Sequence, residues 1–296
     1  MARVARKNYS LARAIMRKGL ETASVAAGHS SSSLRIAPSW FIVGGQRCGS
    51  SSLYEYMVAH PLITRSAVKE IHYYDNNFQR GDSWYRAYFP TRLYARLTAM
   101  RLGREPLAGD ATPYYMAHPH ALGRIAKEYP VAKILVVLRN PVDRAYSHYF
   151  HERGIGHEPL ASFEEAIDRE PERLKGEAER MAADPGYYSF AHQNFSYVTR
   201  GFYVQQLEHL FSLFPRQNIK ILSSGELSKD TAGAMAGVFG FLGLPSNGQE
   251  KFRRENARSY PPLEAPMRRR LQGIFAPHNK RLFTLLGVDY GWNKVV

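Results

Sequence analysis

A segment rich in glycine and serine, Gly44–Ser51, has the residue types that bind a phosphate group. It lies between an apolar run and a helical pattern, where backbone N–H groups and a helix N-terminus attract an anion. Three of its positions fit the Walker A pattern of nucleoside triphosphatases, but Ser50 stands where that pattern has lysine. A cation comes three residues earlier, as Arg47. The segment predicts a phosphate site that is poorly suited to a triphosphate, and a glycine-rich turn without a ligand is the simpler alternative.

A second candidate site follows the β-branched run Lys133–Leu138. Arg139 comes directly after this run, and its guanidinium can form two parallel hydrogen bonds with a phosphate. Ser147 lies in the helix that Pro141 is expected to open, and it can add a hydroxyl group. Alternatively, Arg139 only forms an ion pair with Asp143 at the end of the strand.

Alternating strand and helix patterns predict how these segments are positioned. Short apolar runs indicate buried strands at Trp40–Val43, Lys133–Leu138 and Asn218–Leu222. Helical periodicity covers four stretches: Ser50–His60, Phe163–Met181, Gly201–Phe214 and Thr231–Leu242. This order predicts an α/β fold, a three-layer sandwich with a central parallel sheet. We expect the first run to be a central strand with the second as its neighbour or near neighbour, so that both candidate sites lie at the carboxyl ends of strands.

Composition limits the class of protein. The chain has 296 residues, of which 44% are hydrophobic and 22% charged, as in ordinary globular proteins. It has one cysteine, Cys48, which excludes an internal disulfide and makes a cysteine-based zinc site very unfavourable. It has no apolar run long enough for a transmembrane helix. We expect two parts, a basic extension over residues 1–39, which can be partly helical, and an α/β domain over residues 40–296.

The net charge of +14 is concentrated at the two ends of the chain. Residues 1–39 have seven lysines and arginines but one acid, and residues 251–296 have ten and three. Residues 1–19 can form a basic amphipathic helix, as in an organellar transit peptide or a membrane-surface helix, although a solvated and partly frayed extension is the favoured interpretation. The extension lacks the apolar core of a secretory signal. We expect a cytoplasmic protein that can contact a membrane through this extension.

Both candidate sites together resemble the two cofactor motifs of sulfotransferases, which use 3′-phosphoadenosine 5′-phosphosulfate (PAPS). The resemblance is closest to the heparan sulfate N- and 3-O-sulfotransferases and their bacterial relatives, and it covers roughly residues 40–292. Six further segments match in order and spacing: Lys69–Asp75, Gly81–Tyr85, Thr112–Tyr115, Gly201–Leu207, Pro277–Phe283 and Gly291–Trp292. It implies a P-loop-NTPase-like sulfotransferase fold. It also implies sulfuryl transfer from PAPS to a hydroxyl or amine of a carbohydrate or glycoconjugate, glycolipids included.

The resemblance also implies roles for individual residues. Glu70 matches the family's general base, His72 a histidine lining the same site, and Arg47 a lysine beside the transferring group. The 5′-phosphosulfate would lie on the loop residues Arg47, Cys48, Gly49, Ser50, Ser51 and Ser52. The 3′-phosphate would contact Arg139 and Ser147, and the late cofactor loop includes Arg258 and Tyr260. No metal is expected.

The sequence departs from the family pattern in four places. Arg47 replaces the loop lysine, and Ala111 replaces a substrate-site lysine, which argues against a glycosaminoglycan acceptor. The late loop has Asn256-Ala257 in place of Lys-Gly, and the cysteine pair that brackets it in many animal members is missing.

Each catalytic candidate also has a structural alternative. Glu70 can be a surface acid paired with Lys69, and His72 a buried histidine with satisfied hydrogen bonds. Arg47 can hold the loop by pairing with Asp110.

Two other functions fit part of the sequence. A P-loop phosphotransferase would have a similar loop. However, Ser50 replaces the lysine with which such an enzyme binds the phosphates of a triphosphate. A non-enzymatic binder of nucleic acid or another polyanion would explain the sequence pI of about 9.8. However, the basic residues are not interleaved with aromatic ones as in a known nucleic-acid module, so we expect no nucleic-acid partner.

Overall fold

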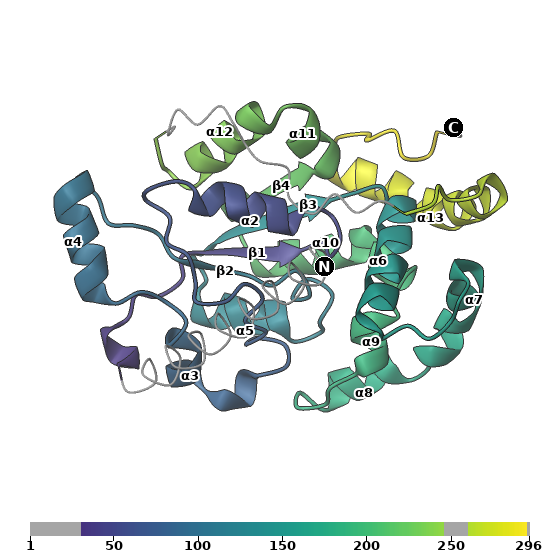
Figure 1. Cartoon of the computed structure of the whole chain (residues 1–296), viewed down its shortest axis with the longest axis horizontal. Helices are drawn as coiled ribbons and strands as arrows, with labels where there is room; N and C mark the ends of the chain where they lie inside the picture. Colours follow the sequence, from purple (N-terminus) through teal and green to yellow (C-terminus); the bar gives the residue numbers. More distant parts are fainter. Residues whose placement is uncertain (1–30, 246–259, 295–296) are drawn as a thin grey trace, which may run out of the picture.

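A parallel sheet of four strands forms the centre of the molecule (Figure 1). The computed structural model describes residues 31–245 and 260–294. The strands lie in the order β2-β1-β3-β4 and are β1 (Trp40–Gly44), β2 (Gly109–Ala111), β3 (Lys133–Leu138) and β4 (Ile219–Ser223). β1 pairs directly with β3, with Phe41 opposite Ile134, so the predicted adjacency and the interior position of β1 are confirmed. β2 was not predicted, because Gly-Asp-Ala is neither apolar nor β-branched.

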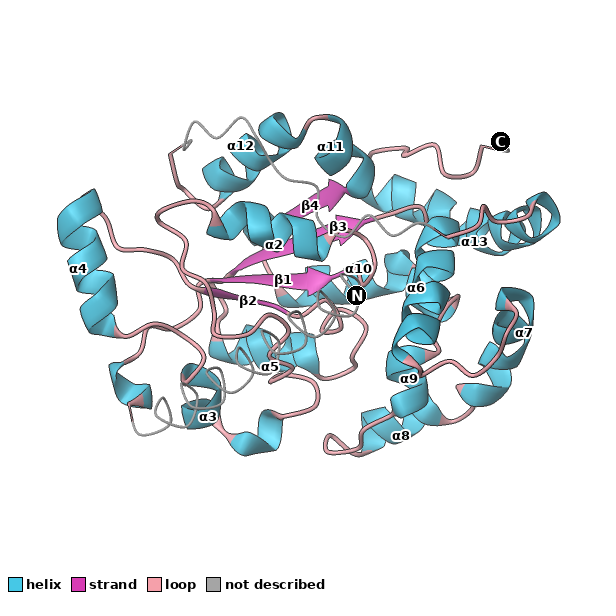
Figure 2. Cartoon of the chain, in the orientation of Figure 1, coloured by secondary structure: helices cyan, strands magenta, loops and turns pink. Residues whose placement is uncertain are grey.

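Helices cover both faces of the sheet and give the predicted three layers (Figure 2). One face carries α2 (Ser50–Val58), α11 (Ser224–Lys229) and α12 (Thr231–Phe241). The other carries α5 (Ala121–Glu128) and α10 (Tyr203–Leu213), with α13 (Ala265–Leu286) against α10. The residues of β1 are completely buried between these layers, which explains their uninterrupted apolar sequence.

A second group of helices stands beside the carboxyl ends of the strands (Figure 1). It contains α6 (Pro141–Ile155), α7 (Phe163–Arg173), α8 (Glu177–Ala183) and α9 (Phe190–Asn194). α6 and α7 share a separate apolar core with α13, in which Tyr149, Ile167 and Leu271 are buried. The predicted single helix over Phe163–Met181 is wrong, because Gly176 adopts a left-handed conformation with φ of 75° between α7 and α8.

The remaining elements lie towards the amino ends of the strands. They are α3 (Asp82–Arg86), α4 (Arg92–Leu102), η1 (Ser32–Leu34) and η2 (Phe78–Arg80), while η3 (Thr199–Gly201) and η4 (Arg216–Asn218) flank α10. The Nη1 of Arg35 donates to the carbonyl of Phe89 at 2.5 Å, so the chain contacts the domain from this residue onward. Residues 1–30, which include most of the predicted basic extension, lie outside the described residues. Within residues 31–245 and 260–294, no helix combines the length and the apolar character that a bilayer crossing requires.

Candidate active site

The loop between β1 and α2 has the geometry of an anion site. The N–H of Gly45 donates to the carbonyl of Val137 in β3 at 2.7 Å, and the N–H of Cys48 donates to the carbonyl of Gly45 at 3.2 Å. Arg47 and Gly49 take left-handed conformations, with φ of 64° and 108°. α2 begins at Ser50, so the first turn, which contains Ser50, Ser51 and Ser52, lies at the positive end of the helix.

Three predicted cofactor residues meet beside this loop. The Nε of Arg47 donates to the Oγ of Ser147 at 3.3 Å, and the Nη1 of Arg139 reaches the carbonyl of Arg47 at 3.4 Å. α6 places Ser147 because Asn140 caps its first turn, where the side chain accepts from the N–H of Val142 at 3.0 Å. The structure therefore brings together two candidate sites that lie about 90 residues apart in the sequence.

Asp143 does not form the ion pair with Arg139 that was considered as an alternative. Its carboxylate accepts from the Nη2 of Arg268 at 2.9 Å, on the neighbouring helix α13. Arg139, Asp143 and Arg268 line a cavity of about 300 Å³, together with Tyr146, Tyr260, Pro261, Pro262 and Leu263. The ring of Tyr260 stacks on Phe150 at 5.1 Å, which fixes it at the wall of this cavity. Arg258 lies outside the described residues.

Buried cations surround the loop. Arg144 is fully buried and Arg200 is 4% exposed, and the Nε of each has no hydrogen-bond partner among the described residues. Burial lowers the pKa of His148 well below its usual value, and the charges of Arg200 and Arg144 lower it further. These groups create a positive potential in a low-dielectric region, which favours an anionic ligand.

Cys48 lies under the loop with 1% of its surface exposed. Its Sγ is 3.6 Å from the hydroxyl of Tyr203, which donates to the carbonyl of Arg139 at 2.9 Å. Burial raises the pKa of the thiol, although the hydrogen bond with Tyr203 and the charges of Arg144 and Arg139 oppose the shift. The thiol therefore packs in the core, and a cofactor on the loop would meet the backbone of Cys48 rather than its side chain.

The candidate base and histidine lie on a separate segment, Lys69–Asp75. Glu70 and His72 have φ of 63° and 55°, a conformation that is rare for residues with a side chain. The Nδ1 of His72 is 2.7 Å from a carboxylate oxygen of Asp75, and its Nε2 is 3.8 Å from a carboxylate oxygen of Glu70. Burial of His72 opposes its protonation, but the hydrogen bond and charge of Asp75, together with the charges of Glu70 and Asp110, outweigh burial and raise its pKa.

The Glu70 carboxylate contacts the ammonium of Lys69, and its side chain is 42% exposed. The pairing considered as a structural alternative is therefore present. It is compatible with catalysis, because the exposed carboxylate can still be reached by an acceptor group.

Residues that follow β2 hold this segment in place. The hydroxyl of Tyr115 accepts from the N–H of Tyr73 at 3.0 Å, and the Oγ1 of Thr112 accepts from the N–H of His72 at 3.5 Å. Thr112 and Tyr115 in turn donate to Asp110, at 2.8 Å each. Burial raises the pKa of Asp110 to about 6, against the effect of these hydrogen bonds. Arg47 contacts Ser147, so the proposed Arg47–Asp110 pair is not what holds the loop.

Arg200 was not among the predicted site residues, and it connects the two halves of the site. Its guanidinium donates to the side chain of Gln46 in the loop and lies over the ring of Tyr114 at 4.9 Å. That ring is 6.5 Å from the ring of His72. Burial lowers the pKa of Arg200 to about 10. A signal was available, because an arginine directly precedes the matched segment Gly201–Leu207.

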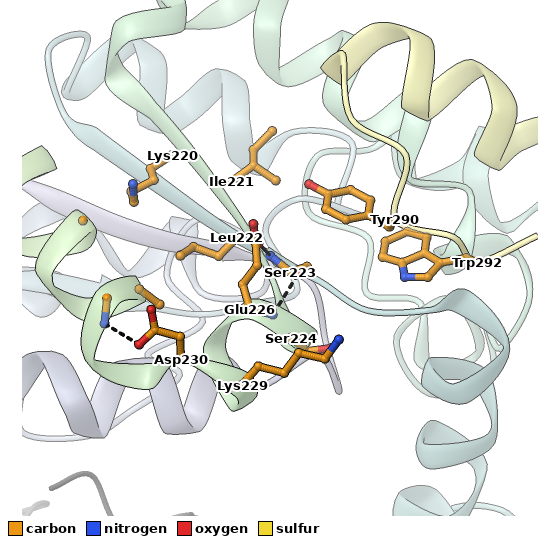
Figure 3. A pocket seen from close by; sticks show the side chains of 14 residues that line it. Lys220, Ile221, Leu222, Ser223, Ser224, Glu226, Lys229, Asp230, Tyr290 and Trp292 are labelled. Carbon is orange, nitrogen blue, oxygen red and sulfur yellow. Dashed lines mark hydrogen bonds between the residues drawn. The ribbon is translucent and has the colours of Figure 1, made fainter. Parts of the chain in front are cut away.

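A groove of about 610 Å³ lies along β4 and reaches the carboxyl end of that strand (Figure 3). Lys220 and Ile221 of β4 line it, with Asp230 on one side and Tyr290 and Trp292 on the other. Ser223 and Glu226, which form the capping box of α11, also line it. No sequence signal pointed to this groove.

No group of three or more histidine, cysteine or acidic residues within residues 31–245 and 260–294 is arranged to hold a metal ion.

Comparisons with known proteins agree with this geometry. Residues 37–263 match the family model described as "Sulfotransferase domain". Human heparan sulfate glucosamine 3-O-sulfotransferase 6 is 28% identical over 290 residues, covering 86% of this chain and 73% of that protein. Human bifunctional heparan sulfate N-deacetylase/N-sulfotransferase 3 is 27% identical over 285 residues, covering 84% of this chain and 30% of that protein.

A solved structure supports the same conclusion. The sulfotransferase from Alicyclobacillus acidocaldarius superposes with a TM-score of 0.67 at 28% identity, covering 88% of this chain and all of that one. Most of the described domain, from β1 to the start of α13, lies in the matched region, including the loop and Arg139. The P-loop-like fold predicted from the sequence is thus confirmed, and the chain belongs to the sulfotransferase family of enzymes.

Proposed function

We propose that the protein transfers a sulfuryl group from PAPS to a hydroxyl group of a carbohydrate acceptor. The observation that carries this proposal is the contact of Arg47 with Ser147 and Arg139, which joins the phosphate loop to the end of β3. Two anion-binding elements so close together suit a nucleotide that carries phosphate groups at both its 5′ and 3′ positions.

The described residues fit such a donor. The first turn of α2 and Arg47 would hold the 5′-phosphosulfate, since backbone N–H groups, a helix N-terminus and a cation converge there. Arg139 and Ser147 would hold the 3′-phosphate, next to the cavity that Tyr260 lines. A role for Arg258 stays a prediction. The buried cations Arg144 and Arg200 strengthen these interactions by raising the local positive potential.

PAPS would supply the sulfuryl group, which passes from a phosphate oxygen to the acceptor oxygen. Glu70 would accept the proton of the acceptor hydroxyl, and its carboxylate contacts the ammonium of Lys69. His72, oriented by Asp75, would donate a hydrogen bond to the acceptor or to Glu70. Arg47 and the loop amides would stabilise the charge that develops on the departing phosphate, as sulfuryl transfer, like phosphoryl transfer, depends chiefly on positioning and charge.

Similarity to enzymes named for heparan sulfate supports a carbohydrate acceptor. Ala111 occupies the position of their substrate-site lysine, and it is buried in this protein. Loss of a cation at this position favours an acceptor with fewer anionic groups than a glycosaminoglycan. Transfer to an amine is the second reaction that the same base would support.

We further propose that the protein is cytoplasmic and that its basic residues 1–39 contact anionic membranes. The support for this is composition, with seven basic residues and one acid in this stretch.

Incubation with ³⁵S-labelled PAPS and a panel of acceptors tests the proposed reaction. The panel contains neutral oligosaccharides, desulfated and sulfated heparan sulfate, glycolipids and phenols, with Glu70→Gln as the control for background transfer. We expect label in carbohydrate, and more in neutral than in highly sulfated acceptors. Label only in phenols would overturn the carbohydrate acceptor. Phosphoryl transfer from Mg-ATP in place of sulfuryl transfer would overturn the proposed donor.

A further inference from the structure

α4 presents an apolar surface to solvent. Leu93, Leu97 and Met100 are 66%, 56% and 83% exposed, and Ala95 is the one residue of the helix that is fully buried. Residues three and four apart share one face of a helix, so the three exposed side chains form a continuous stripe on the side opposite Ala95. Single exposed apolar residues are ordinary, but a stripe of three on one helix indicates a binding surface.

Arginines border this stripe on both sides. By helical spacing, Arg92 and Arg96 lie along one edge of the stripe and Arg101 along the other, and all three are exposed. The helix contains no acidic residue. An apolar stripe between two basic edges is the pattern of a helix that lies in the surface of an anionic membrane.

We propose that α4 docks this protein on a lipid surface that carries anionic headgroups. Leu93, Leu97 and Met100 would enter the boundary between headgroups and acyl chains, while the arginines contact lipid phosphates or carboxylates. This inference is independent of the proposed sulfuryl transfer, since it rests on a different part of the molecule.

Charge favours an anionic membrane over two other partners, a second copy of this chain and the chain's own residues 1–30. A second copy placed symmetrically on α4 would bring arginine edges against arginine edges. Residues 1–30 have six basic residues and one acid, so the same repulsion would act against them. An anionic membrane attracts the arginines, and its hydrocarbon layer can bury the apolar stripe. A nucleic-acid backbone is also anionic, but it offers no apolar layer for the stripe.

The position of α4 leaves the active site accessible. In Figure 1, α4 stands at the amino ends of the strands, whereas the loop after β1 and the helix α6 lie at their carboxyl ends. Docking through α4 therefore covers neither Arg47 nor Glu70. We expect activity on a soluble acceptor to be the same with and without vesicles.

Vesicle co-sedimentation of the full chain tests the proposal, with vesicles of phosphatidylcholine alone or with about 30% phosphatidylserine. The wild-type protein should bind only the anionic vesicles strongly. Arg96→Gln/Arg101→Gln should bind about 30-fold more weakly, because each arginine at such a surface contributes a factor of roughly five. Leu93→Ser/Leu97→Ser/Met100→Ser should weaken binding at least about tenfold through the lost apolar contact.

Matched controls use exposed residues away from α4. Ile155→Ser/Val288→Ser removes apolar side chains that are 49% and 47% exposed, and Arg169→Gln removes a surface charge. These variants should bind like the wild type, and thermal unfolding should show that every variant is folded.

Four outcomes would overturn the proposal. They are unchanged binding by the α4 variants, equal binding to neutral vesicles, a dimer in solution that the α4 variants disrupt, and an α4-dependent affinity for oligonucleotides in place of vesicles. All of these readouts are independent of sulfuryl transfer, so they stand whether or not the proposed reaction is found.

Discussion

The phosphate loop, Gly44–Ser51, and the base segment, Lys69–Asp75, are the two parts of the proposed site, but they are built differently. The loop is formed by backbone hydrogen bonds and continues into a helix, with a glycine, Gly49, in one of its two left-handed positions. The base segment places two residues with large side chains, Glu70 and His72, in left-handed conformations. Side chains hold it there, chiefly Asp75, Thr112 and Tyr115.

This difference separates binding from catalysis. A site made of backbone groups binds any ligand with the right phosphates and tolerates changes of side chain. A segment that keeps unfavourable backbone conformations must be held by its surroundings, and such segments often occur where exact orientation matters. We therefore expect substitutions in the base segment to affect rate and those around the loop to affect cofactor affinity, with Arg47 between the two.

Glu70→Gln should have the largest effect. Loss of a general base typically lowers the rate by about 10²–10⁴, while the loop that binds the cofactor is unchanged. Transfer of ³⁵S should fall to near background while calorimetry shows unaltered affinity for the desulfated product, 3′-phosphoadenosine 5′-phosphate. Substantial activity in this variant would show that the base lies elsewhere, with His72 as the next candidate.

Arg47→Ala tests whether the loop also contributes to the rate. Removal of one preorganised donor from the developing charge typically costs about 10²–10³ in kcat. Arg47→Lys should recover part of this loss, because lysine keeps the charge but not the planar fork. Measuring kcat and cofactor Kd separately decides the role of Arg47. If the cofactor Kd rises and kcat at saturation stays the same, Arg47 contributes only to cofactor binding.

Arg139→Ala should change affinity more than rate. A hydrogen bond to a charged group contributes roughly 1.5–3 kcal/mol, so binding of 3′-phosphorylated nucleotides should weaken about 10- to 150-fold. Affinity for analogues without the 3′-phosphate should change little. An unchanged preference for the 3′-phosphate would place that group away from Arg139.

A comparison of Glu70→Gly with Glu70→Ala measures the cost of the left-handed backbone conformation at this position of the base segment. Both variants lack the carboxylate, but glycine adopts a φ near 63° without the steric penalty that alanine meets there. The glycine variant should be more stable by about 1 kcal/mol, measured as the free energy of unfolding in urea. Equal stabilities would mean that the segment relaxes to an ordinary conformation, and that its geometry is not enforced by its neighbours.

Much of the fold was predictable because its signals are local. Trp40–Val43 and Lys133–Leu138 are uninterrupted apolar runs, and only burial on both faces of a sheet explains them. The strand β2 and the break at Gly176 were missed. β2 depends on its pairing with β1, and the break depends on a single glycine within a helical pattern.

The candidate site was predictable to a similar extent. Arg47 and Arg139 come soon after β1 and β3, and Ser147 lies in the helix that follows β3, so their proximity follows from the parallel sheet. Arg200 was missed, because its contacts with Gln46 and Tyr114 arise only in the folded chain. The left-handed conformations of Glu70 and His72 had no local signal either, since neither residue type favours them.

The buried thiol of Cys48 makes the loop observable in solution. It is the single cysteine of the chain, so a thiol reagent can label only this position. With 1% of the residue exposed and with the pKa of the thiol raised by burial, labelling requires the loop to open. The rate of labelling therefore depends on how often the loop opens. A ligand that holds the loop closed should lower this rate. The reactivity of Cys48 thus reports how often the phosphate loop opens.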